Sequence, residues 1–294
     1  MRVVLIGANG QLGTDLVPAL KNETLIPVAR ADLDITMPAD VLLDTLSRYS
    51  PDVIINTAAY HRVDEMEDYP DKAFLVNGTA VGRLAKAADQ LKALFVHIST
   101  DYVFDGKKKA PYIEEDPPAP QSIYSVSKLV GEYMAASYAS RHLVIRSCGL
   151  YGAAGCRASG GTNFVETMLR LAREKGSVRV VSDQMVTPTP TRVLAELISK
   201  LIHTTETGLF HATCRGECSW YDFAAAIFRL TGTRVTLEKT TSAEFASKAK
   251  RPSYSVLENR RLKKLGMDHL PAWESALESY LREKHPDLMA AARP

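Results

Sequence analysis

The sequence predicts an α/β protein: a Rossmann-like, doubly wound parallel sheet with a smaller C-terminal α/β domain. Three observations support this fold class. Short, continuously apolar runs alternate with amphipathic stretches over the first 150 residues, the first run leads directly into a glycine-rich segment, and the alternation loosens after residue 150. Strands that are apolar along their whole length are typical of a parallel sheet that helices cover on both faces.

The elements of the first half follow this alternation in order. Strands are expected at 2–6, 24–29, 52–59, 93–100 and 142–147. Helices are expected between them, at 11–20, 38–49, 71–91 and 122–139. Pro38 suits the second of these helices, because proline is well tolerated in the first helical turn.

The second half is less regular. A Gly/Ser/Ala-rich loop covers 152–163, and helices are expected at 163–174, about 190–203, 219–230 and 272–283. Strands are expected at 178–183 and 208–214. The 190–215 unit is expected to return to the main sheet, which gives two domains, 1–147 plus 190–215 and 148–189 plus 216–294.

Composition excludes several classes of protein. The formal net charge of +2 over 294 residues argues against a nucleic-acid surface. The apolar run at the N-terminus is short and no later stretch approaches 18 apolar residues, so we expect a soluble, cytoplasmic protein with no membrane partner. Cys148, Cys156, Cys214 and Cys218 do not have the spacing of a zinc site, and we expect reduced thiols.

A glycine loop follows the first strand, where "GANGQLG" places Gly7, Gly10 and Gly13 three residues apart. Glycines allow a sharp turn and bring backbone N–H groups against a pyrophosphate at a helix N-terminus. The loop has one residue more than the common G-x-G-x-x-G fingerprint. The first domain is therefore expected to bind NAD(P) and the second to bind the substrate.

The end of the second strand bears on the choice of cofactor. An acidic residue there binds the 2′-hydroxyl of NAD, whereas an arginine suits the 2′-phosphate of NADP. Arg30 lies nearest the expected position in "PVARADLDIT", and the acids come later, at Asp32 and Asp34. This order favours NADPH and leaves NADH open.

Two further groups suggest proton chemistry. Tyr124 precedes Lys128 by four residues in "SIYSVSKLVGE", so both lie on one face of the expected helix. An ammonium near a phenol stabilises the phenolate and so assists proton transfer. The pattern alone is close to chance expectation, but Thr100 ends the strand "ALFVHIST", and ligands bind at the carboxyl ends of parallel strands. A hydroxyl there can hold a substrate carbonyl oxygen while the phenol protonates it.

In this order the motifs resemble an extended short-chain dehydrogenase/reductase. The segments "DVIINTAAYHRVDEMEDYP", "STDYVFDG", "YSVSKLVGE", "GTNFVETMLRLA", "SDQMVTPT", "CSWYDFA" and "KRPSYS" resemble the dTDP-4-dehydrorhamnose reductase family along essentially the whole chain. The resemblance implies reduction of the C4 ketone of dTDP-4-dehydro-L-rhamnose to dTDP-L-rhamnose, for cell-surface polysaccharide. NAD(P)H would deliver the hydride, Thr100 would bind the ketone oxygen, Tyr124 would donate the proton, and Lys128 would make Tyr124 more acidic and hold the nicotinamide ribose.

The resemblance also implies binding residues. Together with Arg30, the expected cofactor-binding residues are Gly7, Asn9, Gly10, Gln11, Leu12, Gly13, Asp34, Ile35, Ala58, Ala59, Tyr60, Tyr124 and Lys128. The expected substrate-binding residues are Thr100, Asp101, Tyr102, Tyr124, Asn163, Phe164 and Arg251, the last of them on a phosphate. Simpler roles stay open for three of these, since Asn163 could cap a helix, Phe164 could belong to the core and Arg251 could be a surface charge.

The chain departs from the family at two places. Family members often carry a tryptophan where "RSCGLYG" has Gly149, which implies an altered sugar pocket. Some members bind magnesium through glutamates where this chain has Asp15 and Arg192, and an arginine cannot ligate a metal, so no metal site is expected.

A reductase of a related nucleotide-linked 4-keto-6-deoxysugar is one alternative to the function that the resemblance implies. The others are a non-catalytic regulatory subunit resembling methionine adenosyltransferase β and an epimerase or dehydratase of the same superfamily. A homodimer is a possibility.

Overall fold

A six-stranded parallel sheet forms the centre of the molecule, which is described here by a computed structural model covering residues 1–155, 160–245 and 247–291. The strand order is β10-β5-β4-β3-β1-β2, and every neighbouring pair is parallel. The strands are β1 (Arg2–Ile6), β2 (Thr24–Val28), β3 (Val53–Asn56), β4 (Leu94–Thr100), β5 (His142–Ser147) and β10 (Gly208–His211). The predicted parallel sheet is confirmed.

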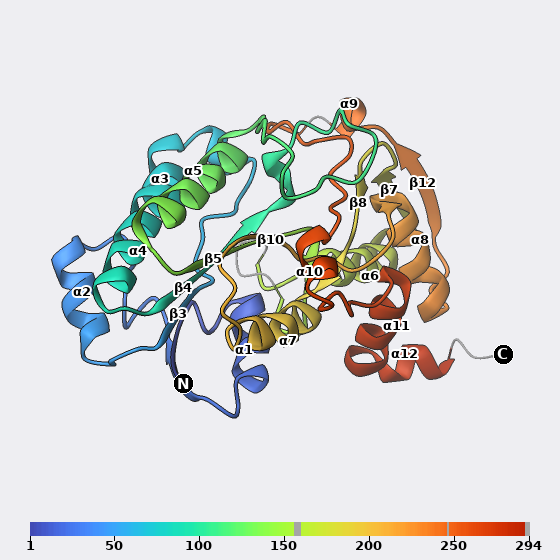
Figure 1. Cartoon of the computed structure of the whole chain (residues 1–294). Coiled ribbons are helices and arrows are strands. Elements are labelled where there is room, and N and C mark those ends of the chain that lie inside the picture. The colour runs from blue at the N-terminus through green and yellow to red at the C-terminus, as the bar shows by residue number, and fades with distance from the viewer. Residues whose placement is uncertain (156–159, 246, 292–294) are drawn as a thin grey trace.

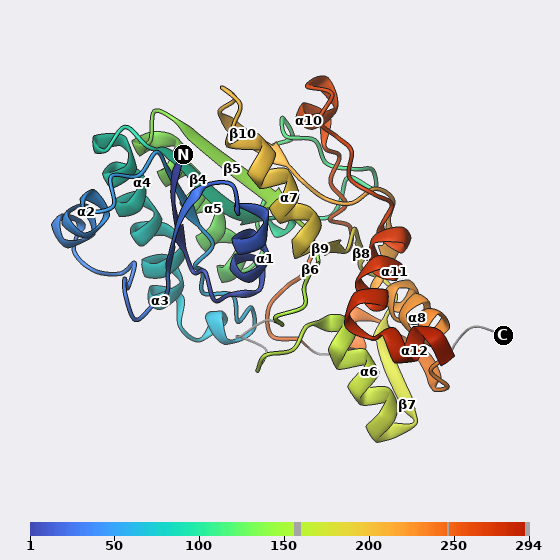
Figure 2. The same ribbon diagram turned by 90° about the horizontal axis from the view of Figure 1, so that it is seen from below.

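Helices cover both faces of this sheet. Figures 1 and 2 show α2 (Ala39–Ser47), α4 (Ala80–Gln90) and α5 (Ile123–Tyr138) on one side, and α1 (Gln11–Ala19) and α7 (Thr191–Leu201) on the other. The strand residues divide between the two layers in alternation: Val3 and Leu5 pack with α1 and α7, whereas Val4 and Ile6 pack with α2 and α4. The alternation explains why each strand is apolar along its length.

The sheet has its topological switch point between β1 and β3. The chain leaves β1 into α1 on one face and leaves β3 towards α4 on the opposite face, and the two strands are neighbours. Open α/β sheets bind ligands in the crevice at the carboxyl ends of such strands. The glycine loop that follows β1 lies at this crevice.

The helix expected at 71–91 contains a change of winding. It consists of α3 (Pro70–Phe74), a π-helical turn η2 (Leu75–Thr79) and α4. The buried side chain of Asn77, inside the turn, bonds both backbone groups of Tyr60 and the hydroxyl of Ser127. Because these partners are distant in sequence, the local pattern did not reveal the turn.

A second lobe packs beside the first and lies on the right of Figure 1. Its helices are α6 (Phe164–Lys175), α8 (Trp220–Thr231), α11 (Trp273–Lys284) and α12 (Pro286–Ala291). A parallel strand pair, β7 (Ser177–Val181) and β12 (Thr236–Thr240), lines the lobe, and β12 was not predicted because its sequence is mostly polar. Buried residues such as Leu169, Phe223 and Leu277 form its core.

Short elements complete the chain. Two strand pairs, β6 (Leu150–Tyr151) with β9 (Thr189–Pro190) and β8 (Met185–Val186) with β11 (Cys218–Ser219), lie between the larger units. The remaining pieces are the 3-10 turns η1 (Glu65–Glu67) and η3 (Asp101–Val103) and the short helices α9 (Ser242–Phe245) and α10 (Arg260–Lys264).

The 190–215 segment returns to the first sheet, since β10 pairs with β5 and α7 packs in the first core. Leu262 of α10 and Leu270 also join that core. The division into two domains at the expected residue limits stays a prediction.

The structure also bears on the expectations about membrane spans and cysteines. Over the described ranges, no helix combines the length and the apolar character needed to cross a membrane. Cys148, Cys214 and Cys218 are buried free thiols, and Cys156 lies outside the described residues.

Candidate active site

Gly7 and Gly13 in the loop between β1 and α1 are too tightly packed for a side chain at either position. Gly7 has a φ of +82°, and a Cβ on it would lie 2.7 Å from Thr57 Oγ1. A Cβ on Gly13 would lie 2.2 Å from the carbonyl oxygen of Gly7, so the first turn of α1 rests directly on the loop. Gly10, the N-cap residue of α1, carries no side chain that could cap the free N–H groups. This geometry fits a pyrophosphate at the helix N-terminus.

The side chains of the loop differ in their surroundings. Asn9 is exposed, whereas Leu12 is buried in the core beneath the loop. Gln11 donates to the carbonyl oxygen of Leu150 at 3.1 Å, and its buried Oε1 has no hydrogen-bond partner within the described part of the chain. An unpaired buried acceptor at this position suits a hydroxyl or amide donor from a bound dinucleotide.

The segment after β3 forms the other wall of the crevice. Asn56 is fully buried and accepts from the backbone N–H of Ala58 at 3.1 Å. Ala59 is half-buried, and the hydroxyl of Tyr60 donates to Glu65 at 2.6 Å. Burial and this carboxylate raise the pKa of Tyr60 to about 12. Tyr60 is therefore neutral and held in place, and its contact with a cofactor stays a prediction.

At the end of β2, Arg30 and Asp34 form an ion pair, with Arg30 Nη2 3.0 Å from Asp34 Oδ2. The side chain of Arg30 is 84% exposed, so it is free to reach a phosphate in solvent. Asp34 also accepts from the backbone and hydroxyl of Thr36, and these bonds hold the pKa of its carboxyl below the usual value. Ile35 is buried in the core, so its side chain serves packing.

The end of β4 gathers three of the expected substrate residues. Thr100 Oγ1 donates to Asp101 Oδ1 at 3.0 Å and accepts from the N–H of Tyr102 at 3.2 Å. Asp101 is buried, and its Oδ2 has no hydrogen-bond partner among the residues described. Burial raises the pKa of Asp101 to about 6, against the opposing effect of the polar side chains of Cys148, Ser255 and Thr100.

Helix α5 brings Tyr124 to this strand end. The helix begins at a capping box in which the side chains of Ser122 and Ser125 each bond the other residue's backbone N–H. Tyr124 therefore lies in the first turn, and its ring meets that of Tyr102 edge-on, with the centroids 6.0 Å apart. Tyr102 thus contacts both residues: its N–H bonds the expected carbonyl-binding hydroxyl of Thr100, and its ring meets that of the expected proton donor Tyr124.

Lys128 lies one turn further along α5 and is buried against β4. Its Nζ donates to the carbonyl oxygen of Ile98 at 2.6 Å and lies 3.4 Å from His97 Nε2. Burial lowers the pKa of Lys128 to about 8, although the Glu132 carboxylate acts in the opposite direction. Burial and the lysine charge also lower the pKa of His97 well below its ordinary value. At neutral pH the site thus holds an ammonium beside an uncharged imidazole.

Two buried charged residues near Lys128 were not identified from the sequence: Glu132 and Arg146. Arg146 of β5 binds Glu132 of α5 through two bonds, of 2.8 Å and 2.6 Å, and Ser99 donates to the same carboxylate at 2.5 Å. Glu132 continues the i, i+4 stripe of Tyr124 and Lys128, so the helical period was a usable indication. The long-range partner in β5 had no local indication.

The expected substrate residues of the second lobe have partners within the protein. Asn163 caps α6 by accepting from the N–H of Glu166, and it donates to Gly152 and Tyr280. The guanidinium of Arg251 forms a two-point ion pair with Asp64, at 2.8 Å and 3.2 Å. The simpler capping role of Asn163 is thus present, and contacts of both residues with a substrate stay predictions.

Gly149 follows β5 in a left-handed conformation, with φ at +55°. A Cβ on it would lie 3.1 Å from Pro188 Cα and 3.5 Å from the indole of Trp220. Phe164, at the start of α6, is half-buried and lies against Trp220, with ring centroids 4.6 Å apart. An aromatic ring therefore lies beside Gly149, but it comes from the second lobe.

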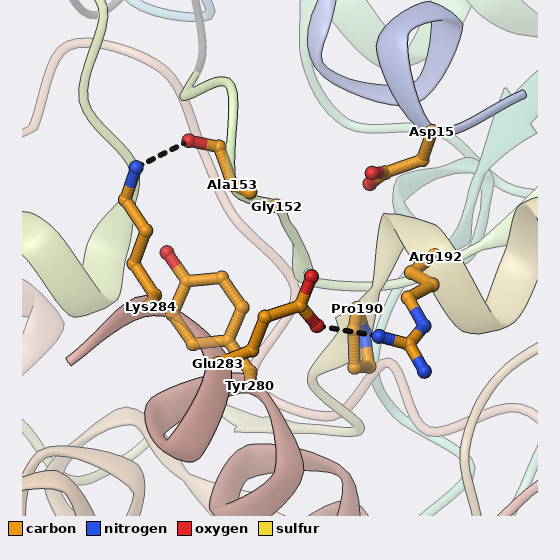
Figure 3. Close-up of a pocket in the computed structure, with 8 residues that line it drawn as sticks. All are labelled: Asp15, Gly152, Ala153, Pro190, Arg192, Tyr280, Glu283 and Lys284. Atoms are coloured by element: carbon orange, nitrogen blue, oxygen red, sulfur yellow. Dashed lines mark hydrogen bonds and ion pairs between the residues drawn. The ribbon is translucent and has the colours of Figure 1, made fainter. Parts of the chain in front are cut away.

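Asp15 and Arg192 lie in a small pocket between α1, α7 and α11. Figure 3 shows the guanidinium of Arg192 reaching Glu283, and the two groups are 2.5 Å apart. Thr191 donates to Asp15 at 2.5 Å, while burial raises the pKa of the Asp15 carboxyl. Over the described ranges, no three His, Cys, Asp or Glu side chains are grouped so that they could hold a metal ion.

Comparison with known proteins shows which family this chain belongs to. Residues 1–285 match the family described as RmlD substrate binding domain. The spore coat polysaccharide biosynthesis protein SpsK of Bacillus subtilis is 39% identical over 285 residues, which cover 96% of this chain and 98% of SpsK. A Streptomyces antibioticus protein named a probable dTDP-4,6-dihydroxy-2-methyloxan-3-one 4-ketoreductase is 37% identical over 299 residues, covering 100% of this chain and 98% of that one.

A solved structure is also similar to this chain over nearly its whole length. The crystal structure of dTDP-4-dehydrorhamnose reductase from Bacillus anthracis in complex with NADP superposes with a TM-score of 0.91 at 36% identity, covering 96% of this chain and 99% of that one. The family match extends over nearly the whole chain and includes the glycine loop and the elements that carry Thr100, Tyr124 and Lys128. This chain therefore belongs to the RmlD substrate binding domain family, together with the dTDP-4-dehydrorhamnose reductases.

Proposed function

We propose that the protein reduces the C4 ketone of dTDP-4-dehydro-L-rhamnose to dTDP-L-rhamnose with NAD(P)H. The observation that carries this proposal is that α5 packs on the carboxyl end of β4: Tyr124 contacts Tyr102, whose N–H bonds Thr100, and Lys128 bonds the carbonyl oxygen of Ile98. The end of β4 lies one strand beyond the switch point that carries the glycine loop. The membership in a family with dTDP-4-dehydrorhamnose reductases supports the choice of substrate.

Each of the three residues has a stated role. Thr100 donates its hydroxyl hydrogen to the ketone oxygen, in exchange for its present bond to Asp101. Tyr124 gives its phenolic proton to the same oxygen as negative charge develops there. Lys128 places a positive charge one helical turn from Tyr124 and so favours loss of that proton. The bound cofactor supplies the hydride.

NADPH is the proposed cofactor in preference to NADH. Arg30 at the end of β2 carries an exposed guanidinium, the group that suits a 2′-phosphate. The Bacillus anthracis relative is in complex with NADP. We also propose that the reaction takes place in the cytoplasm, where NADPH is available, and a homodimer stays a possibility.

A reductase of a related nucleotide-linked 4-keto-6-deoxysugar is the second candidate. Gly149 favours this reading, because it stands where a tryptophan is expected in the family and the aromatic ring beside it is Trp220 of the second lobe. The name of the Streptomyces antibioticus relative also indicates a 4-ketoreductase that acts on a different dTDP-sugar.

A spectrophotometric assay tests the proposal. NADPH or NADH oxidation is followed at 340 nm with dTDP-4-dehydrorhamnose, and the product is identified by chromatography and NMR. The expected result is stoichiometric oxidation of NADPH and formation of dTDP-L-rhamnose.

Other outcomes support other functions. Formation of a different epimer of the product sugar, or turnover only with another 4-keto-6-deoxysugar, supports the second candidate. Absence of turnover with every keto-sugar, together with a stoichiometric protein partner, supports the regulatory subunit instead. Tightly bound NAD with no net oxidation supports an epimerase or dehydratase.

A further inference from the structure

Two half-buried aromatic side chains face each other where the second lobe meets the end of β5. Phe164 and Trp220 are the first residues of α6 and α8, and their ring centroids are 4.6 Å apart with the planes tilted by 41°. Behind them lies Phe223, which is fully buried in the core of the lobe and stacks on Phe164 at 5.5 Å. The pair thus rests on a rigid base and keeps part of its surface open.

Gly149 links this pair to the catalytic strands. Ser147 is the register partner of Thr100 in the sheet, and Gly149 follows two residues later, a span of at most about 7 Å. A Cβ on Gly149 would lie 3.5 Å from the Trp220 ring, which puts the indole in contact distance of this backbone. The positive φ of Gly149 and the nearby Pro188 Cα, 3.1 Å from that Cβ, make a larger residue strained at this position. The indole edge therefore lies close to the carboxyl ends of β4 and β5.

We propose that Trp220, supported by Phe164, forms an aromatic wall against the hexose ring of the nucleotide-linked sugar and determines specificity for a 6-deoxyhexose. The inference rests on the proposed function. An aromatic face offers a flat apolar surface, which suits the C–H face and C6 methyl group of a deoxysugar. A hexose with a 6-hydroxyl loses a water contact against such a surface and gains no partner for it.

The tryptophan content of the chain allows a direct test. The sequence has two tryptophans, and the second, Trp273, is only 6% exposed and belongs to the core of the second lobe. Intrinsic fluorescence is measured while dTDP-L-rhamnose, dTDP-glucose or dTDP is added to the wild type, Trp220→Phe and Trp273→Phe. The expected result is a fluorescence change with dTDP-L-rhamnose in the wild type and in Trp273→Phe, and its loss in Trp220→Phe. A much smaller change is expected with dTDP, which lacks the hexose.

Calorimetry and kinetics complete the test. Trp220→Ala is expected to weaken dTDP-L-rhamnose about ten- to a hundredfold, to leave the affinity for dTDP and NADPH unchanged, and to reduce the preference for dTDP-L-rhamnose over dTDP-glucose. An undiminished fluorescence change in Trp220→Phe, or wild-type affinity of Trp220→Ala for dTDP-L-rhamnose, would overturn this inference but not the proposed function. An equal fluorescence change with dTDP would place the indole on the nucleotide and overturn the hexose assignment. If the wild type binds no dTDP-sugar by calorimetry, the proposed function itself is overturned.

Discussion

Replacing Arg146 by methionine tests whether a buried ion pair holds the catalytic helix against the sheet. The side chains of Arg146 and Glu132 are 3% and 7% exposed, and two bonds of 2.8 Å and 2.6 Å join them. Ser99, the residue before Thr100, donates to the same carboxylate. The pair therefore ties α5, which carries Tyr124 and Lys128, to the ends of β4 and β5.

The expected loss of stability follows from this geometry. Charges about 4 Å apart attract each other by about 4 kcal/mol at an effective dielectric constant near 20. Removing one partner of a buried pair leaves the other charge desolvated and typically costs about 3–5 kcal/mol. Arg146→Met is therefore expected to lower the free energy of unfolding by about 3–5 kcal/mol. Its turnover should also fall, because Arg146 of β5 no longer holds Glu132 of α5 in place.

Urea unfolding at pH 7, followed by circular dichroism, measures this loss. The double variant Glu132→Leu with Arg146→Met removes both charges and should recover most of the lost stability. Arg170→Met is the matched control, because Arg170 pairs with Glu174 on the exposed face of α6, and its expected cost is below about 1 kcal/mol. A loss for Arg146→Met no greater than that of the control, or a double variant no more stable than the single one, would refute the reasoning.

Three further predictions concern the site. First, kcat/KM should fall as the pH rises through about 8, because Lys128 loses its charge there; a flat profile up to pH 10 contradicts this role. Second, the raised pKa of Asp101 means that the wild type loses stability as the pH rises from the ordinary 3.8 through about 6. Asp101→Asn should thus be more stable than the wild type by about 3 kcal/mol at pH 8, because it carries no buried charge, and should lose this advantage near pH 3.5. Thermal or urea unfolding measures the difference, and equal stability of the two proteins at pH 8 would contradict the raised pKa of Asp101. Third, Gly13→Ala should cost about 1–3 kcal/mol of stability and weaken NADPH binding in calorimetry, because its methyl group collides with the Gly7 carbonyl; unchanged affinity is the contrary result.

The sequence predicted the main sheet because each of its strands is apolar on both faces, which the two helical layers require. The glycine loop was predictable because its glycines directly follow the first strand. The Gly7 carbonyl and Ala8 exclude a side chain at Gly13, whereas the contact that excludes one at Gly7 comes from Thr57, which is distant in sequence. Tyr124 and Lys128 were placed on one face of the expected helix at 122–139 by their spacing, and the capping box at Ser122 shows why that helix begins where it does.

Features that depend on distant partners were not predictable. The π-helical turn at Leu75–Thr79 accompanies the bonds of Asn77 to Tyr60 and Ser127, which are 17 and 50 residues away. The ion pair of Glu132 and Arg146 joins a helix to a strand and has no local pattern in β5. The position of Trp220 beside Gly149 depends on how the second lobe packs on the first.

Replacing Tyr124 by phenylalanine tests whether this phenol donates the proton in the ketone reduction. Its kcat with dTDP-4-dehydrorhamnose and NADPH is compared with that of the wild type, and calorimetry measures binding of NADPH and dTDP-L-rhamnose to both proteins. We expect the kcat of Tyr124→Phe to be lower by about 10²–10⁴-fold, with both affinities changed less than about threefold. Turnover by Tyr124→Phe within a few-fold of the wild type would contradict this role.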